Sequence, residues 1–223
     1  MIALDKVGYD YGGAPLFTDV SLDLPQGSFS FLTGPSGAGK TTLLKLCYGA
    51  LPAMAGDVAV LNTPIDPLDR DGFALLRRRI GVVHQDCAFV DHLSISENIA
   101  LPLTVAGRDV AVQDLLDLLA WVGLRKQADQ LPPSLSGGER QRAALARAVI
   151  AGPDVVIADE PTGNVDWEMS QRLLALLVEL NKMGKTIVIA THDLHLIRMA
   201  KAQVAARVLR LKDGQLTQAQ ADL

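Results

Sequence analysis

A glycine-rich segment near the N-terminus has residue types that bind phosphate groups. Residues 34–41 read Gly-Pro-Ser-Gly-Ala-Gly-Lys-Thr, between an apolar run at 29–33 and a helical pattern that starts near Leu43. The glycines let several backbone N–H groups point at one anion, and the start of the helix adds partial positive charge. Lys40 can reach the β- and γ-phosphates of a nucleotide, and the Thr41 hydroxyl can bind Mg²⁺. The predicted phosphate site consists of Gly34, Pro35, Ser36, Gly37, Ala38, Gly39, Lys40, Thr41 and Thr42.

An acidic pair far along the chain could complete the chemistry of such a site. Asp159 and Glu160 directly follow the apolar run 155–158. A parallel strand delivers ligands at its carboxyl end, so Asp159 is predicted to hold Mg²⁺ and Glu160 to orient and polarise an attacking water molecule. Taken alone, an acidic pair after a strand is more often a helix cap or a surface feature. The upstream phosphate loop favours the functional interpretation.

A second glycine motif lies between these two. Residues 135–139 read Leu-Ser-Gly-Gly-Glu and precede a helical pattern over 140–150. Ser136, Gly137 and Gly138 therefore stand before a helix, where exposed N–H groups can bind another anion.

Alternating strand and helix patterns must position these residues. Three runs, at 29–33, 155–159 and 186–190, are apolar almost throughout, as strands covered on both faces are. Apolar residues at three- and four-residue spacing from Met169 to Met183 indicate an amphipathic helix that covers one face. The sequence therefore predicts an α/β fold with helices on both sides of a sheet.

The ends and the middle of the chain follow other patterns. Alternating apolar and polar residues at 2–7 and 22–24 indicate half-exposed antiparallel strands, which would add a mixed edge to the sheet. Near the C-terminus, the run 208–211 and the turn at 213–214 predict a hairpin. The region from about 88 to 152 is mostly helical by pattern and is predicted to form a helical subdomain.

Length and composition exclude several classes of protein. The chain has 223 residues, of which 49% are apolar, and a formal net charge of −4. These values fit one globular domain over residues 1–223, and they fit neither a disordered chain nor a polybasic nucleic-acid arm. The apolar runs are much shorter than the ~20 residues that span a bilayer, and the N-terminus does not resemble a signal peptide. We therefore expect a cytoplasmic protein that reaches a membrane only through a partner.

The cysteines and one basic run carry weaker signals. Cys47 and Cys87 are too few and too isolated for a metal cluster or a disulfide framework, so buried reduced thiols are expected. The run Arg77-Arg78-Arg79 is not interleaved with aromatic residues, and it is predicted to form a solvated or partner-facing corner rather than a nucleic-acid site.

The order of the motifs carries a family resemblance over essentially the whole chain. The phosphate loop, Gln85, Leu-Ser-Gly-Gly-Glu, the acidic strand end and His192 follow one another as in the ATP-binding-cassette (ABC) ATPases, which the chain resembles. The resemblance implies a P-loop ATPase core with a mixed sheet, an antiparallel N-terminal β subdomain and a helical subdomain. It also implies ATP and Mg²⁺ as ligands, and Mg²⁺-dependent hydrolysis of ATP.

The resemblance assigns roles to further residues. In the family, the residue at Gln85 touches Mg²⁺ or water and senses the membrane partner, and the residue at His192 contacts the γ-phosphate and helps the glutamate. Tyr11 lies where relatives stack an aromatic ring on adenine, although Tyr9 is close enough to compete. Asp166 belongs to a loop that communicates across a dimer. The predicted catalytic residues are Glu160, His192 and Gln85, and the predicted metal ligands are Thr41, Gln85 and Asp159.

The serine-glycine motif implies a partner copy. In the family, the residues at Ser136, Gly137 and Gly138 face the γ-phosphate that a second copy binds, so a head-to-tail dimer of this chain is expected. Two positions depart from the common pattern, because Glu139 stands where Gln is common and Val165 where Leu is common. We expect the second change to alter packing more than chemistry.

Several segments resemble one branch of the family, the ATP-binding proteins of bacterial cell division. They include the sequences at 43–46, 98–103 and 161–164. That branch works with an FtsX-like integral membrane protein at the cytoplasmic face of the inner membrane, where ATP cycling controls peptidoglycan hydrolysis. In the family, the region at 87–103 borders the groove that receives a helix of the partner, so its exposed residues are expected to dock the partner. The segments 139–142 and 161–164 are also found in lipoprotein-release and macrolide-efflux ATPases, which are the alternative.

Two other classes fit less well. A scaffold that binds ATP without depending on its turnover would be favoured by a changed Glu160 or His192, and both are present. Soluble ABC proteins of translation or DNA repair have paired cassettes or long coiled insertions, which this sequence lacks.

Overall fold

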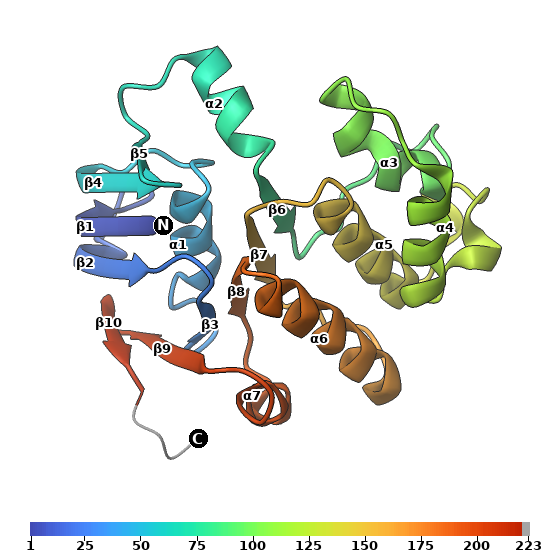
Figure 1. Ribbon diagram of the computed structural model, residues 1–223. Coiled ribbons are helices and arrows are strands. Elements are labelled where there is room, and N and C mark those ends of the chain that lie inside the picture. The colour runs from blue at the N-terminus through green and yellow to red at the C-terminus, as the bar shows by residue number, and fades with distance from the viewer. Residues whose placement is uncertain (220–223) are drawn as a thin grey trace.

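A six-stranded sheet forms the centre of the molecule (Figure 1). The structure is a computed structural model and describes residues 1–219. In the strand order β10-β9-β3-β8-β7-β6, neighbouring strands are parallel except for β10, which is antiparallel to β9. These strands are β3 (Phe29–Thr33), β6 (Ile80–Val83), β7 (Val155–Asp159), β8 (Thr186–Ala190), β9 (Ala206–Lys212) and β10 (Gln215–Gln218).

The three central strands are buried along their whole length. Every residue of β3, β7 and β8 is buried. Phe29 and Phe31 contribute to a hydrophobic core on one face of the sheet, whereas Leu32 contributes to the core on the other face. Because successive side chains of a strand point to opposite faces, a strand covered on both sides needs few polar positions.

A smaller antiparallel sheet lies beside the central one, with helix α1 between the two sheets (Figure 1). Its strand order is β2-β1-β4-β5. The pairs Leu4–Leu22 and Tyr9–Phe17 align the first two strands. Side chains of this sheet, of α1 and of one face of the central sheet form a single core. The elements are β1 (Ile2–Tyr9), β2 (Phe17–Leu24), α1 (Lys40–Cys47), β4 (Ala55–Val60) and β5 (Thr63–Pro64).

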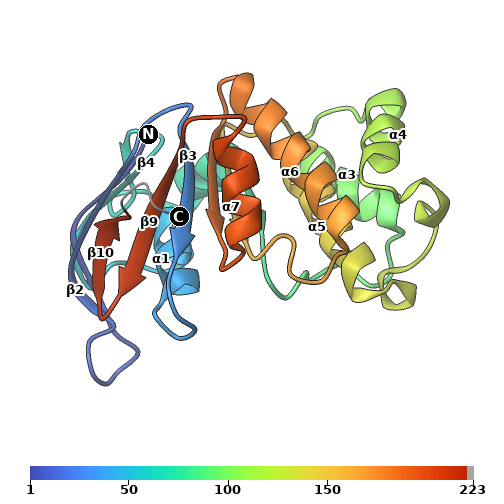
Figure 2. The same cartoon turned by 90° about the horizontal axis from the view of Figure 1, so that it is seen from below.

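Helices cover the other face of the central sheet and extend to one side of it (Figures 1 and 2). Buried side chains of α5, α6 and α7 share the second core with β3, β7 and β8, and α3 and α4 extend this core away from the sheet. The helices are α2 (Arg70–Arg77), α3 (Ile95–Val105), α4 (Val112–Trp121), α5 (Gly137–Val149), α6 (Trp167–Lys182) and α7 (Leu194–Lys201). Short 3₁₀ turns at Arg125–Gln127 and Pro132–Ser134 connect α4 to α5.

The parallel strands bring distant loops to one edge of the sheet. β3, β7 and β8 run in the same direction, so the segments that follow Thr33, Asp159 and Ala190 start at the same edge. This edge holds the glycine-rich loop, Glu160 and His192, which are far apart in the sequence.

The structure confirms the predicted fold class. The three central strands have the predicted bounds, the predicted terminal hairpin is β9–β10, and the predicted amphipathic helix is α6. The strand before Gln85 ends at Val83, so Gln85 lies in the following loop. Residues 220–223 of the predicted domain 1–223 lie outside the described residues, and the division into subdomains remains a prediction.

The described residues contain no helix long and apolar enough to cross a membrane. Cys47 and Cys87 are both buried and free of disulfides, as expected. Burial raises the pKa of the Cys47 thiol to about 12.

Candidate functional site

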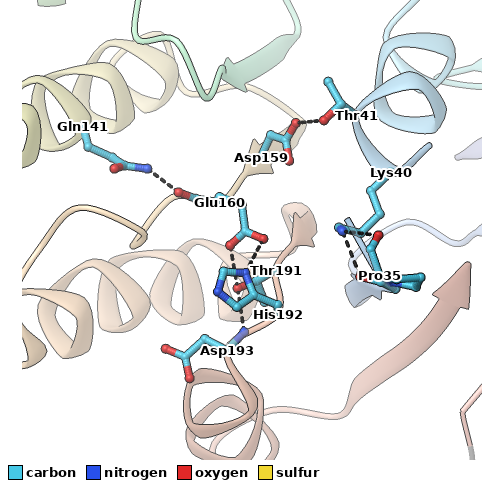
Figure 3. Close-up of polar contacts among 10 residues, drawn as sticks. Pro35, Lys40, Thr41, Gln141, Asp159, Glu160, Thr191, His192 and Asp193 are labelled. Atoms are coloured by element: carbon cyan, nitrogen blue, oxygen red, sulfur yellow. Dashed lines mark hydrogen bonds and ion pairs between the residues drawn. The ribbon is translucent and has the colours of Figure 1, made fainter. Parts of the chain in front are cut away.

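The glycine-rich loop turns sharply between β3 and α1. Gly39, at the N-cap of α1, adopts the left-handed conformation with φ of 96°. A Cβ atom there would lie 2.8 Å from Cε1 of Phe17, so both the backbone and the available space require glycine. The Lys40 ammonium donates to the carbonyl oxygens of Gly34 at 2.9 Å and Pro35 at 3.2 Å, which holds it over the loop (Figure 3).

The first helical turn connects this loop to the acidic end of β7. The Thr41 hydroxyl donates to Oδ2 of Asp159 at 2.5 Å, across 118 positions of sequence (Figure 3). Burial raises the pKa of the Asp159 carboxyl, and the neighbouring Glu160 acts in the same direction, whereas the Thr41 hydrogen bond and the Lys40 charge oppose them. A cation placed here would stabilise the ionised carboxylate.

Glu160 makes a paired contact with the loop after β8. Oε1 of Glu160 lies 2.8 Å from Nδ1 of His192, and Oε2 accepts from the Thr191 hydroxyl at 3.1 Å (Figure 3). A carboxylate can only accept, so the proton of a neutral His192 is held on Nδ1 and leaves Nε2 to face outward. The His192 side chain is largely exposed, whereas that of Glu160 is largely covered.

The backbone of Glu160 is held in an uncommon conformation. Its φ is +48°, which few residues other than glycine adopt. Its N–H donates to the carbonyl oxygen of Ala190 at 2.9 Å, and its own carbonyl accepts from the N–H of Gly163 and from Nε2 of Gln141. These three contacts stabilise the position of the carboxylate.

Gln141 was not predicted from the sequence. Its side chain is only 1% exposed, and every other buried residue of α5 is apolar, Ala144 and Leu145 among them. A glutamine on the apolar side of a helix is the signal that could have identified it, because a buried amide needs a partner. Thr191 was not predicted either. It is also fully buried, and its buried hydroxyl likewise needs a partner.

A cavity of about 570 Å³ joins most of the predicted site residues. This volume suits a ligand of small-molecule size. Tyr11 is exposed at the cavity, and its hydroxyl lies 2.9 Å from that of Thr42, whereas Tyr9 is buried in the core of the antiparallel sheet. The lining residues are Tyr11, Leu16, Ser36, Gly37, Gly39, Lys40, Thr41, Thr42, Gln85, Asp159, Glu160 and His192.

The serine-glycine motif does not line this cavity. Ser136 forms the N-cap of α5, and its hydroxyl and the Glu139 carboxylate cap each other's backbone N–H groups. The hydrogen bonds from Ser136 lower the pKa of the Glu139 carboxyl. Gly138 lies against the loop after β7, where a Cβ atom would be 2.6 Å from the carbonyl oxygen of Asn164. In the same loop, the Asp166 carboxylate accepts from Met169 N–H and caps α6.

A side-chain contact joins the Gln85 loop to α5. The guanidinium groups of Arg140 and Arg147 lie 5.5 and 4.6 Å from the ring centroid of Phe89. Nη2 of Arg140 also donates to the carbonyl oxygen of Cys87 at 3.4 Å. The segment after Gln85 is therefore held against the helix that begins at the serine-glycine motif.

A second hollow, of about 390 Å³, lies among α2, β6, α3 and α5. Its surface is mainly apolar, and the guanidinium-bearing residues Arg77, Arg78 and Arg147 line it. Arg79 does not line it and instead pairs with Asp154 at 2.7 Å. The apolar lining consists of Ala74, Ile80, Gly81, Val82, Leu101, Pro102, Val105, Ala148, Ala151 and Pro153.

The family follows from a comparison with known proteins. A family described as ABC transporter matches residues 17–163. The chain belongs to the ABC transporter family. The predicted family is therefore confirmed.

Curated ABC relatives cover nearly the whole chain. The cell division ATP-binding protein FtsE of Haemophilus influenzae is 43% identical over 203 residues, which are 89% of this chain and 93% of the relative. The protein of the same name from Escherichia coli K12 is 40% identical, and the match covers 97% of this chain and 97% of the relative. The one from Bacillus subtilis is 36% identical, and the match covers 96% of this chain and 93% of the relative. The predicted resemblance to the cell-division branch is also confirmed.

Solved ABC structures share the fold. The ATP-binding cassette MJ0796, in a dimeric post-hydrolysis state bound to ADP and Pi, superposes with a TM-score of 0.89 at 32% identity and covers 98% of both chains. A second dimeric structure of MJ0796, described as a bacterial ABC transporter cassette, also gives 0.89, at 33% identity over 97% of this chain and 96% of its own.

Proposed function

We propose that this chain is the ATP-hydrolysing subunit of a membrane complex that acts in bacterial cell division. The proposal of ATP hydrolysis rests on one observation. The Glu160–His192 pair, the Thr41–Asp159 pair and Lys40 all line the same cavity. Identity of 36–43% to proteins named FtsE supports the part in cell division.

The glycine-rich loop and α1 bind the nucleotide in this proposal. The backbone from Gly34 to Thr42 surrounds the phosphates, and Lys40 leaves its loop carbonyls to contact the β- and γ-phosphates. Tyr11 stacks on adenine, since it is exposed at the cavity and Tyr9 is not.

The oxygen donors at this edge fit Mg²⁺. Thr41 offers a hydroxyl, Asp159 a carboxylate and Gln85 an amide oxygen, and all three line the same cavity. When bound, Mg²⁺ supplies positive charge that offsets the charge of the phosphates. No group of three or more His, Cys, Asp or Glu side chains within residues 1–219 could hold a metal ion. Hydroxyl and amide oxygens are therefore part of the proposed ligand set.

Glu160 orients the water that attacks the γ-phosphate. Its backbone is fixed on both sides, and Thr191 and His192 hold its carboxylate oxygens. In its protonated form His192 donates from Nδ1 to Glu160 and from its outward Nε2 to the γ-phosphate. Accurate placement of the carboxylate contributes to the rate because the proton transfer depends on geometry.

A second copy of the chain completes the site. Ser136, Gly137, Gly138 and Asp166 do not line the cavity of their own chain. A head-to-tail pair would present the N-terminus of α5 to the nucleotide of the other copy, where its N–H groups and partial positive charge favour the γ-phosphate. The two dimeric structures of MJ0796 support pairing of two copies.

The hollow beside α2 receives the membrane partner, an FtsX-like integral membrane protein, at the cytoplasmic face of the inner membrane. The docking surface was expected among the exposed residues of the range 87–103. Within that range Ile95 and Ile99 are buried. Leu101 and Pro102, also within it, line the hollow, and so does Val105 just beyond it. Its apolar lining suits one face of an amphipathic helix from the partner.

Hydrolysis and its cellular effect are tested separately. Lys40→Ala should weaken ATP binding, whereas Glu160→Gln should keep binding and lose turnover, because the phosphate-binding loop stays intact. Equal hydrolysis by the wild type and Glu160→Gln would disprove the enzymatic assignment.

The cellular test uses depletion of the protein in the cells that encode it. We expect filamentous or poorly separated cells that the wild type corrects and Glu160→Gln does not. Normal division, with lipoproteins accumulating in the inner membrane, would contradict the role in division.

A further inference from the structure

The hollow of about 390 Å³ beside α2 contains positive charge without any opposite charge. Arg77, Arg78 and Arg147 line it, and every other residue of the range 1–219 that lines it is apolar. The chain as a whole has a formal net charge of −4, so three guanidinium groups in one apolar hollow differ sharply from its average charge. We call Arg77, Arg78 and Arg147 the hollow arginines.

Arg147 is the least exposed of the hollow arginines. Its guanidinium lies 4.6 Å from the ring centroid of Phe89, which holds the side chain in place on α5. Burial lowers the pKa of the Arg147 guanidinium, and within the described part of the chain only Cys87 acts in the opposite direction. A half-buried cation without an anion costs free energy, so the hollow favours an occupant that supplies a negative charge.

Arg77 and Arg78 are exposed, and backbone carbonyl groups hold them at the hollow. Nη2 of Arg77 donates to the carbonyl oxygen of Gly49 at 2.9 Å, and Nη2 of Arg78 donates to that of Val105 at 3.5 Å. A guanidinium has five N–H donors, so both side chains keep donors for a further acceptor. The hollow therefore offers several N–H groups at fixed positions.

The next arginine along the chain lies outside the hollow and has a carboxylate partner. Arg79 pairs with Asp154 at 2.7 Å and does not line the hollow. Asp154 also lies 3.5 Å from the Lys185 ammonium. Among residues 1–219, a carboxylate thus accompanies the cations beside the hollow, whereas none lines the hollow itself. A carboxylate for the hollow arginines has to come from the occupant.

We propose that the segment of the membrane partner in this hollow is an amphipathic helix with an Asp or Glu that pairs with Arg147. The inference rests on the proposed function, which places the membrane partner here. A guanidinium binds a carboxylate through two parallel N–H···O bonds, and such charge complementarity selects among partners. A helix with the same apolar face and a Lys or Arg at that position would be repelled. The hollow arginines therefore determine which partner helix the chain accepts.

Two variants that differ in the sign of one charge test the proposal. Val105 lines the hollow and is 65% exposed, so a charge of either sign can be placed there without being buried. Val105→Glu should capture the membrane partner from detergent-solubilised membranes at least tenfold less than Val105→Lys, because only the glutamate repels a partner carboxylate. Val112→Glu and Val112→Lys are the matched controls. Val112 is 70% exposed and does not line the hollow, so both should capture the partner as the wild type does.

An exchange of charges identifies the paired carboxylate. Arg147→Glu should lose capture of the unchanged partner, and one Asp→Arg or Glu→Arg change in the partner's cytoplasmic segments should restore it at least tenfold. Arg147→Lys should capture more partner than Arg147→Met, which keeps the apolar shaft and loses the charge. If Arg147→Glu does not fold, Arg77→Glu with Arg78→Glu takes its place, because both of these side chains are exposed.

The outcomes separate this proposal from docking in the hollow. Equal loss of capture by Val105→Glu and Val105→Lys would overturn the proposal and leave docking standing, since bulk alone would explain the loss. Capture at the wild-type level by both variants would overturn docking and the proposal together. Absence of any restoring change among the partner's carboxylates would overturn the proposal. Binding of the chain alone to phosphatidylglycerol vesicles and not to phosphatidylcholine vesicles, lost in Arg147→Met, would assign the hollow to a lipid headgroup and would also overturn it.

Discussion

Gly138→Ala should destabilise the chain, although alanine is the better helix former. Gly138 and Gly137 are the first two residues of α5, and neither has a positive φ that would require glycine. They differ in the space around them. A Cβ atom on Gly138 would lie 2.6 Å from the carbonyl oxygen of Asn164, whereas one on Gly137 would be no closer than 4.0 Å to Cβ of Asn164.

The expected magnitude follows from this pair of contacts. A carbon and an oxygen cannot approach to 2.6 Å, so the Asn164 loop or α5 must move by about half an ångström, and overpacking of this kind costs about 1–3 kcal/mol. Replacing glycine by alanine within a helix gains up to about 1 kcal/mol, and this gain applies to both variants. Gly137→Ala should therefore be more stable than Gly138→Ala by about 1–3 kcal/mol, which corresponds to about 2–12 °C in melting temperature at this chain length.

Urea unfolding of both variants and the wild type, without nucleotide, measures the difference. Circular dichroism and intrinsic fluorescence should give coincident transitions with similar m-values, so that midpoints report stability. Equal stability of Gly137→Ala and Gly138→Ala would refute the reasoning, since it would mean that the serine-glycine motif does not pack on the Asn164 loop.

Three further predictions concern other parts of the chain. Because the folded-state pKa of Glu139 is lowered, its ionised form stabilises the fold above the unfolded pKa, and this contribution is lost as the pH falls through the folded pKa. The stability advantage of the wild type over Glu139→Gln, no more than about 0.5 kcal/mol, should therefore stay constant in urea titrations from pH 7 to about pH 5 and shrink below the ordinary glutamate pKa of about 4.3. Gln141→Leu removes the amide that holds the Glu160 carbonyl, so kcat for ATP should fall about tenfold with little change in nucleotide affinity, and an unchanged kcat would show that Gln141 does not position Glu160. Val105→Glu, in the hollow, should weaken binding of the membrane partner in a pull-down at least tenfold and leave ATP binding unchanged. Val112→Glu is the control, because Val112 is exposed to a similar degree (70% against 65%) but does not line the hollow, and it should leave both partner binding and ATP binding unchanged. Equal effects of the two variants would argue against docking in the hollow.

The sequence predicted best the features that depend on short-range patterns. Strands covered on both faces have runs such as 186–190 that are almost entirely apolar, so their position follows from composition alone. The glycine-rich loop could be located because the backbone turn at Gly39 and the phosphate chemistry of Lys40 need particular residues at fixed spacing. Asp159 was predicted to belong to the same site as the phosphate loop because a parallel strand delivers ligands at its carboxyl end, and the structure brings its carboxylate into contact with Thr41.

The missing features depend on three-dimensional contacts between distant segments. Gln141 contacts the backbone of Glu160, and no sequence pattern at Glu160 specifies a partner on α5. The contact of Phe89 with Arg140 and Arg147 likewise depends on how the loop after Gln85 packs on that helix. The sequence left Tyr9 and Tyr11 as alternatives, and the end of β1 at Tyr9 separates them, because Tyr9 is paired in the sheet and buried whereas Tyr11 lies beyond the strand and is exposed.

The composite site is tested most directly by the molar mass of Glu160→Gln and of Glu160→Gln with Ser136→Asp, each with saturating Mg-ATP. Aspartate can still cap α5, but its charge would repel the γ-phosphate of the other copy. Light scattering should show a dimer for Glu160→Gln and a monomer for the double variant, with ATP bound to both. A monomeric Glu160→Gln with ATP bound, alone and with its membrane partner, or a dimeric double variant, would contradict the account.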